Sequence, residues 1–189
     1  MLFVLTQFLT SAPPARVLQT SRASTASVSQ PDGFVPDASN VSAQTSQQLE
    51  ALRLRVVNAP DDTAHVYRLA RMLHDSHKLD EAARNYRHYL AMRPKNRQAW
   101  LDFARTLGQQ KSWDEAERVA QDMLIHYPGD QSGRYNLGAV YANQSRFDEA
   151  SEIWHEVASQ QADTAMAAMA RESLERLNAF VKPRWVTGE

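Results

Sequence analysis

The hydrophobic positions of this chain follow a helical spacing from about residue 46 onward. Apolar residues recur there every three or four positions, and the helix-forming residues Ala, Leu, Arg, Glu and Gln dominate the composition. Runs of β-branched residues are scarce, and no stretch alternates apolar and polar residues as a half-buried strand does. The pattern therefore predicts an all-α domain over residues 46–181.

A repeat of 34 residues runs through this helical region. The triplet Asp-Glu-Ala recurs at 80–82, 114–116 and 148–150, and Pro60, Pro94 and Pro128 keep the same step. These matches divide the region into three units, residues 63–96, 97–130 and 131–164. A fixed period of this length in a helical sequence indicates an α-solenoid of antiparallel helix pairs.

Equivalent positions of the three units carry side chains of similar size. A small residue in the first helix would face a small residue in the second, so that the two backbones approach closely and larger side chains interdigitate around them. The small residues are Ala70, Ala104 and Gly138 in the first helices and Ala82, Ala116 and Ala150 in the second. The third unit departs from the pattern in one column, because Arg134 stands where the others have Val66 and Trp100.

With these columns the chain resembles the tetratricopeptide repeat (TPR) family, most closely over residues 63–164, which implies a right-handed superhelix of helix pairs. Asp80, Asp114 and Asp148 are predicted to cap the second helices, where a carboxylate can accept from free backbone N–H groups. Residues 46–62 would form a leading half-repeat, residues 165–181 a capping helix, and residues 182–189 a tail.

The first 45 residues differ in composition from the repeats. Residues 1–12 begin with the apolar run MLFVLTQFL, which is too short to span a bilayer and is interpreted as a signal or anchor segment. Residues 13–45 are rich in Ser, Thr and Pro and predict a flexible linker. An exported, periplasmic or membrane-anchored location is therefore favoured over a cytoplasmic one. An organelle transit peptide and a start codon placed too late are the alternatives.

Composition and charge argue against several classes of function. Lys and Arg total 21 against 22 for Asp and Glu, a balance that disfavours nucleic acid or an anionic membrane surface as the main partner. The chain has no cysteine, no glycine-rich phosphate loop and no serine nucleophile motif. His74 and His77 are three residues apart, but no carboxylate-rich set accompanies them, so no metal site is expected. We therefore expect no enzyme, no cofactor and no small-molecule substrate.

The TPR resemblance implies a concave wall formed by the first helix of each pair. Carried over to this sequence, the wall positions include Tyr67, Arg71, His74, Gln98, Leu101, Arg105, Gln109, Tyr135 and Asn143. The three apolar or aromatic residues would offer apolar contacts, and Asn143 could bond a peptide backbone. The guanidinium groups of Arg71 and Arg105 could bind a carboxylate. The alternative is a merely solvated groove, in which Asp75 neutralises Arg71.

The wall does not match the chaperone-binding TPR proteins, which clamp a C-terminal carboxylate with Lys and Asn. The matching places here carry Tyr67, Arg71, Asp102, Ser132 and Asn136, so a chaperone cofactor is disfavoured. The sequence favours a non-enzymatic interaction module that binds an acidic segment or C-terminal carboxylate of a partner protein within an assembly. The alternative is a self-associating assembly factor, resembling the TPR subunits of cytochrome c maturation or of pilus and outer-membrane assembly, which oligomerises through convex helices or exposed caps.

Overall fold

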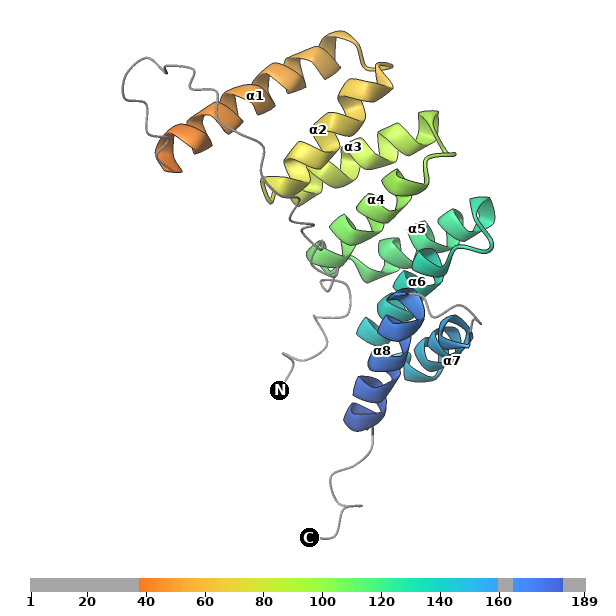
Figure 1. Cartoon of the computed structure of the whole chain (residues 1–189). Helices are drawn as coiled ribbons and strands as arrows, with labels where there is room; N and C mark the ends of the chain where they lie inside the picture. The colour runs from red at the N-terminus through yellow and green to blue at the C-terminus, as the bar shows by residue number, and fades with distance from the viewer. Residues whose placement is uncertain (1–37, 160–164, 182–189) are drawn as a thin grey trace, which may run out of the picture.

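The structure is a computed structural model that describes residues 38–159 and 165–181 (Figure 1). Its helices are α1 Ala38–Asn58, α2 Thr63–Asp75, α3 Leu79–Met92, α4 Arg97–Gln110, α5 Trp113–His126, α6 Gln131–Asn143, α7 Phe147–Ala158 and α8 Ala165–Val181. Every regular element in these two ranges is a helix, so the predicted all-α fold is confirmed. None of these helices combines the length and the apolar character needed to cross a membrane. The predicted signal or anchor segment 1–12 and the tail 182–189 lie outside the described residues.

The helices form two layers of a curved stack (Figure 1). Each helix packs against the next in sequence, and α2 also contacts α4, α4 contacts α6, and α6 contacts α8. In the described part of the chain, the backbones of α1, α3, α5 and α7 do not approach one another closely, and ion pairs such as Arg53–Glu81 and Arg87–Glu115 bridge the gaps between them. The even-numbered helices are therefore crowded together as an inner layer, and the odd-numbered helices are spread apart as an outer layer. This is the solenoid of helix pairs that the 34-residue repeat predicts.

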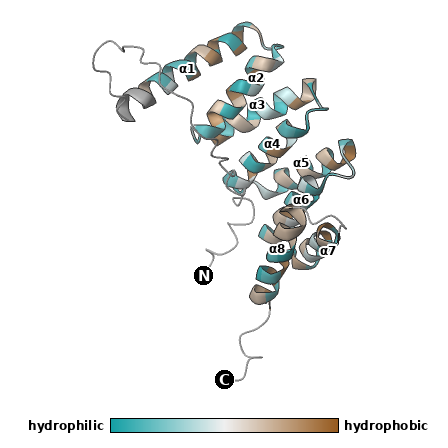
Figure 2. Ribbon diagram, viewed as in Figure 1, coloured by the Kyte–Doolittle hydropathy of each residue, from teal (hydrophilic) through white to brown (hydrophobic). Residues whose placement is uncertain are grey.

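The paired helices approach closely through the small residues, and hydrophilic and hydrophobic residues are interspersed along the helices (Figure 2). Ala70 and Ala82 are fully buried in the first pair. In the third pair, a Cβ atom at Gly138 would lie 2.6 Å from Nε1 of Trp154. Trp154 is itself fully buried, and its Nε1 donates to the carbonyl oxygen of Tyr135 at 3.1 Å. Glycine is required at 138 because the indole ring occupies the space of a side chain.

Substitution of Gly138 by alanine is expected to lower the free energy of unfolding by about 1–3 kcal/mol, because the added methyl group displaces the buried indole of Trp154. Urea unfolding followed by circular dichroism measures the change. Gly129→Ala is the control, since a Cβ there meets nothing within 4 Å, and it should change the free energy by less than about 0.5 kcal/mol. Equal losses in the two variants would contradict this packing.

The helix starts differ from the prediction in one respect. Side chains cap the inner-layer helices α2, α4 and α6, at positions one repeat apart: Asp62, Asn96 and Asp130. The prediction that Asp80, Asp114 and Asp148 cap the outer-layer helices is wrong, because those helices have no side-chain cap and the three carboxylates lie inside the first turn. Asp80 instead accepts a hydrogen bond from Gln110 of the next repeat at 2.6 Å.

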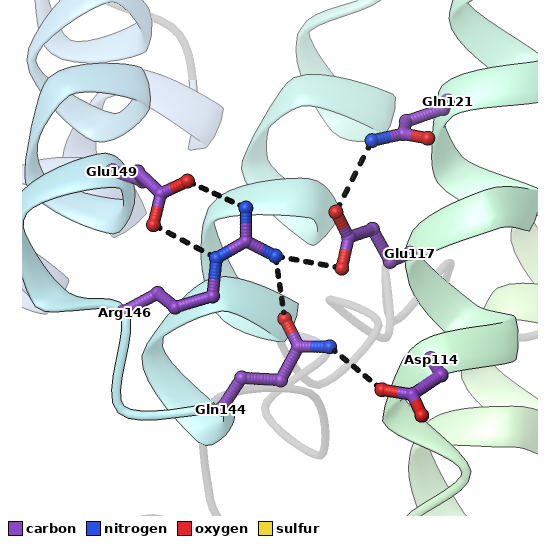
Figure 3. A network of polar contacts seen from close by, with 6 residues as sticks. All are labelled: Asp114, Glu117, Gln121, Gln144, Arg146 and Glu149. Carbon is purple, nitrogen blue, oxygen red and sulfur yellow. Dashed lines mark hydrogen bonds and ion pairs between the residues drawn. The ribbon is translucent and has the colours of Figure 1, made fainter.

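A polar network joins the second and third repeats (Figure 3). Arg146 pairs with Glu149 in its own repeat and with Glu117 on α5. Gln144 donates to Asp114 at 3.2 Å, which repeats the bond between Gln110 and Asp80 one unit earlier. Pairs this close to solvent contribute only about 0–1 kcal/mol each. The recurrence of the Gln–Asp bond at the same repeat positions supports the register of the stack.

Arg134 occupies the column that Trp100 fills in the preceding repeat. The indole Nε1 of Trp100 donates to the carbonyl oxygen of Pro94 at 2.8 Å. Nη2 of Arg134 donates to the carbonyl oxygen of Pro128 at 3.0 Å, which is the same bond one repeat later. Arg134 therefore makes the same hydrogen bond as Trp100 but lacks its aromatic ring.

The two ends of the stack are formed by α1 and α8 (Figure 1). The helix α1 packs against α2 and reaches α3 through the ion pair between Arg53 and Glu81. It begins at Ala38, inside the segment 13–45 that composition assigns to a linker. Ala, Ser and Gln tolerate a helix, so a polar composition does not prevent one there. The helix α8 takes the inner-layer place after α6 and contacts both α6 and α7.

Candidate functional site

The inner face of α2 and α4 is organised around a buried carboxylate, that of Asp102, whose side chain is 7% exposed. The hydroxyl of Tyr67 on α2 donates to its Oδ2 atom at 2.7 Å. Nε2 of Gln98 donates to its Oδ1 atom at 3.0 Å. A buried carboxylate needs such donors in place of water. Asp102 therefore ties α2 to α4 and fixes the positions of Tyr67 and Gln98 on the inner face.

This cluster is suited to recognition by hydrogen bonds. Burial and the bond to Asp102 raise the pKa of the Tyr67 hydroxyl, which therefore stays a neutral donor. Within the two described ranges, no group of three or more His, Asp or Glu side chains is placed to hold a metal ion. In the sequence, Asp102 stands out only as a mismatch to the chaperone clamp. The signal that points to it is a lone acidic residue between Leu101 and Phe103, in a stretch that packs on the core.

Two arginines, Arg71 and Arg105, occupy the same position in successive repeats and are both exposed. The guanidinium carbon of Arg71 lies 6.0 Å from the centre of the Tyr67 ring, and Arg71 has no ion-pair partner among the described residues. Neutralisation by Asp75, the alternative considered from sequence, is therefore not present. Nη2 of Arg105 lies 3.4 Å from Oδ1 of Asp102, and almost half of the Arg105 side chain faces solvent.

A cavity of about 800 Å³ opens beside the N-terminal ends of α2 and α4. Tyr67, Tyr89 and Met92 form its apolar wall, and the rings of Tyr67 and Tyr89 stack with their centres 4.9 Å apart. Arg93 and Lys95 line the cavity and are exposed to solvent. The cavity therefore combines an aromatic wall with cationic groups, next to the two arginines of the inner face.

His74 is buried between α2 and α4. Its Nδ1 lies 2.9 Å from Oγ1 of Thr106, and the Thr106 hydroxyl donates to the backbone carbonyl of Asp102 at 2.8 Å. Because Thr106 has only one proton to give, Nδ1 of His74 carries the hydrogen and donates it. Burial and then the charge of Arg105 lower the pKa of His74. His74 links the two helices as a neutral group, and its assignment to the open wall is thereby corrected.

The stability of the protein is expected to fall as the pH is lowered through the ordinary pKa of histidine. The folded state holds His74 neutral, whereas the unfolded chain binds a proton near pH 6.5. The contribution of His74 is therefore complete above the pKa of histidine in the unfolded chain and is lost as the pH falls from there toward the lowered pKa of the folded state. Urea unfolding at several pH values measures it, and His74→Gln should show a shallower decline than the wild type. Parallel curves for the two proteins would contradict the burial of a neutral ring.

The other predicted wall residues differ in how open they are. Tyr135 is only 3% exposed because α8 covers it, with its hydroxyl 3.1 Å from Oγ of Ser173, so its assignment as a free apolar contact is also corrected. Nδ2 of Asn143 donates to the carbonyl oxygen of Ala139 in its own helix at 2.7 Å. Asn143 itself is half-exposed on α6. The rest of the exposed or half-exposed wall lies on α2 and α4 and consists of Tyr67, Arg71, Gln98, Leu101, Arg105 and Gln109.

Comparisons with known proteins agree with the helical-repeat fold. A family model described as a tetratricopeptide repeat matches residues 73–131. No curated protein sequence matches the chain.

Several solved structures are similar in fold. A MamA fragment from Desulfovibrio magneticus RS-1 is 17% identical, with a TM-score of 0.61 over 75% of this chain and 82% of that one. The TPR domain of Arabidopsis OM64 is 12% identical, with a TM-score of 0.53 over 63% and 96%. A tetratricopeptide repeat protein from Parabacteroides merdae is 18% identical, with a TM-score of 0.62 over 74% and 56%. At these identities the likeness shows the fold alone.

Proposed function

Because this chain is a tetratricopeptide-repeat protein, we propose that it is a non-catalytic interaction module whose inner face binds an acidic segment of another protein. Proteins of this fold generally act as scaffolds for protein partners. The observation that carries the finer proposal is the pair of exposed guanidinium groups, Arg71 and Arg105, at one repeat position of α2 and α4.

The chemistry of the two arginines favours carboxylates. A guanidinium group presents a planar fork of N–H donors that fits a carboxylate, and Arg71 has no carboxylate partner in the described structure. Arg105 makes one long contact with Asp102, which leaves donors available to a ligand. Arg93 and Lys95 at the neighbouring cavity add positive charge on the same side. A partner segment with Asp, Glu or a C-terminal carboxylate complements these groups.

Three nearby acidic residues are occupied by other contacts. Asp62 caps α2 and pairs with His65 at 2.6 Å. Asp130 caps α6 and pairs with Arg97. Asp102 is buried under Tyr67 and Gln98. These carboxylates therefore neutralise groups other than Arg71, and the positive charge of the inner face remains available.

Apolar contacts would complete the binding of an extended segment. Tyr67 and Leu101 are half-exposed on the inner face, and both also pack on the core. Their rings and methyl groups are held rigidly, so a ligand side chain that covers them loses water without requiring rearrangement. The proposed ligand therefore alternates acidic and apolar side chains along the inner face.

Fluorescence anisotropy with labelled short peptides tests the proposal on the full chain. One peptide alternates Glu and Leu, and the matched control alternates Lys and Leu. The Glu peptide is expected to bind, with an affinity that falls as NaCl is raised from about 50 mM to about 500 mM. Equal binding of the two peptides, or a preference for the Lys peptide, would contradict the proposed charge preference.

A further inference from the structure

The outer layer carries a furrow between α3 and α5. The backbones of these two helices do not approach each other closely in the described structure, and the gap between them has a volume of about 750 Å³. Its floor is apolar and consists of Leu90, Trp100, Phe103 and Val119. The ion pair between Arg87 and Glu115 closes one end of the furrow. The guanidinium carbon of Arg87 also lies 5.9 Å from the centre of the Phe103 ring.

The corresponding gap between α5 and α7 has a different character. Arg134 replaces Trp100 at its floor, and the network of Arg146, Glu117 and Glu149 crosses it (Figure 3). An aromatic floor is therefore a feature of the α3–α5 furrow that the repeat does not copy into the next unit. The aromatic floor is not needed for the stacking of repeats, because the repeats on either side of the α5–α7 gap stack without it.

An exposed apolar side chain stands beside the furrow. Ile125 on α5 is 74% exposed and lines the same gap, opposite Ala91 on α3. Covering this aliphatic side chain would remove apolar surface from water, which is favourable. The chain thus presents an apolar projection and an apolar depression next to each other on one surface.

Two charged residues of opposite sign complete this surface. Arg118 and Asp122 lie one turn apart on the outer side of α5, both exposed. Neither has an ion-pair partner in the described part of the chain, and they are not paired with each other. When a helix with this arrangement packs antiparallel to a copy of itself, each Arg faces the Asp of the other copy. Such self-complementarity is what a two-fold symmetric interface requires.

We infer that the α3–α5 furrow is the interface of a homodimer. In this dimer, the α5 helices of two copies run antiparallel across a two-fold axis. Ile125 of each copy enters the furrow of the other, and Arg118 of each copy pairs with Asp122 of the other. The occupant is a second copy because the same surface carries the apolar projection, the apolar furrow and both charged residues. A second copy therefore complements all of these features at once.

The dimer leaves both inner faces open, because the inner-layer helices lie on the opposite side of each copy from the furrow. Two binding faces on one particle would raise the apparent affinity for a partner that carries several acidic segments, through effective concentration. The inference does not rest on the proposed function, since it concerns other residues and a different readout.

Light scattering and sedimentation equilibrium of the full chain over a range of concentrations test the dimer. The wild type should reach twice the chain mass of 21.4 kDa and no more. Ile125→Asp should raise the dissociation constant of the dimer by at least about 100-fold. Val57→Asp is the matched control, because Val57 on α1 is 75% exposed at the same repeat position but lies outside the furrow. It should keep the wild-type mass.

A charge exchange tests the antiparallel pairing. Arg118→Glu alone and Asp122→Arg alone should each weaken the dimer by at least about tenfold, and the double variant should restore it, because the two signs are exchanged in both copies. Circular dichroism checks that every variant stays helical, as expected for exposed positions.

Four outcomes would overturn the inference. These are a wild type that stays monomeric at every concentration, a dimer that survives Ile125→Asp, a dimer lost in Val57→Asp, and a mass that keeps growing beyond two copies. Failure of the double charge variant to restore the dimer would overturn the antiparallel arrangement. The peptide-binding test of the inner face should give the same result in Ile125→Asp as in the wild type, so the two proposals can fail separately.

Discussion

Replacement of Trp154 by alanine is expected to lower the free energy of unfolding by about 3–5 kcal/mol, a loss comparable with much of the stability of a small domain. The side chain is fully buried, lies against Gly138 and the ring of Tyr135, and donates to the Tyr135 carbonyl oxygen. Removing it leaves a large cavity and removes the hydrogen bond between α7 and the backbone of α6. In a solenoid each repeat contacts only its neighbours, so α6, α7 and α8 should lose structure first.

Urea unfolding and hydrogen exchange measure the loss and its location. Trp113→Ala is the control, because Trp113 begins the outer-layer helix α5 of the preceding repeat and is only half-buried. It should lose less than half as much free energy as Trp154→Ala. Equal losses in the two variants, or faster exchange first in α2 and α3 of Trp154→Ala, would contradict the described packing.

Reversal of charge at Arg71 and Arg105 together is expected to abolish partner binding by the inner face. Charge-assisted hydrogen bonds contribute about 1.5–3 kcal/mol each, so the loss of two corresponds to at least about 100-fold in affinity. The fold should be unaffected because both side chains are exposed and Arg71 has no ion-pair partner in the described structure. Anisotropy with the Glu peptide gives the affinity, and circular dichroism gives the helix content.

The matched control reverses two exposed arginines away from the inner face, Arg55 on α1 and Arg84 on α3. It changes the net charge of the protein by the same amount. If the control variant loses as much affinity as Arg71→Glu with Arg105→Glu, the attraction comes from overall charge and not from the inner face. Unchanged binding in the inner-face variant would equally contradict the proposal.

The fold is predictable from the sequence because the main packing positions recur in each of the three repeats. The pair of small residues that lets α2 and α3 approach recurs one repeat later, and Gly138 with Ala150 supplies it again. A single departure such as Arg134 does not obscure the register, since the other columns agree and its own hydrogen bond is kept. Because the pattern recurs in three repeats, a departure in one of them does not change the predicted fold.

The site is less predictable because a repeat position fixes the direction of a side chain but not what covers it. Tyr135 points inward like Tyr67, yet α8, which lies outside the repeat, packs over it. His74 meets Thr106 and Asp102 meets Tyr67 across neighbouring inner-layer helices, contacts that no single repeat contains. The helix caps follow the same rule, since Asp80 bonds Gln110 of the next repeat and caps no helix.

Photo-crosslinking in the native cell tests most directly whether the inner face holds another polypeptide. A photoreactive amino acid replaces Gln109, which is exposed on α4 beside the inner face, or Arg84, which is exposed on the outer helix α3. We expect a crosslinked product with a different protein from position 109 and none from position 84. A different protein crosslinked from position 84 alone, or no product from position 109, would contradict the account.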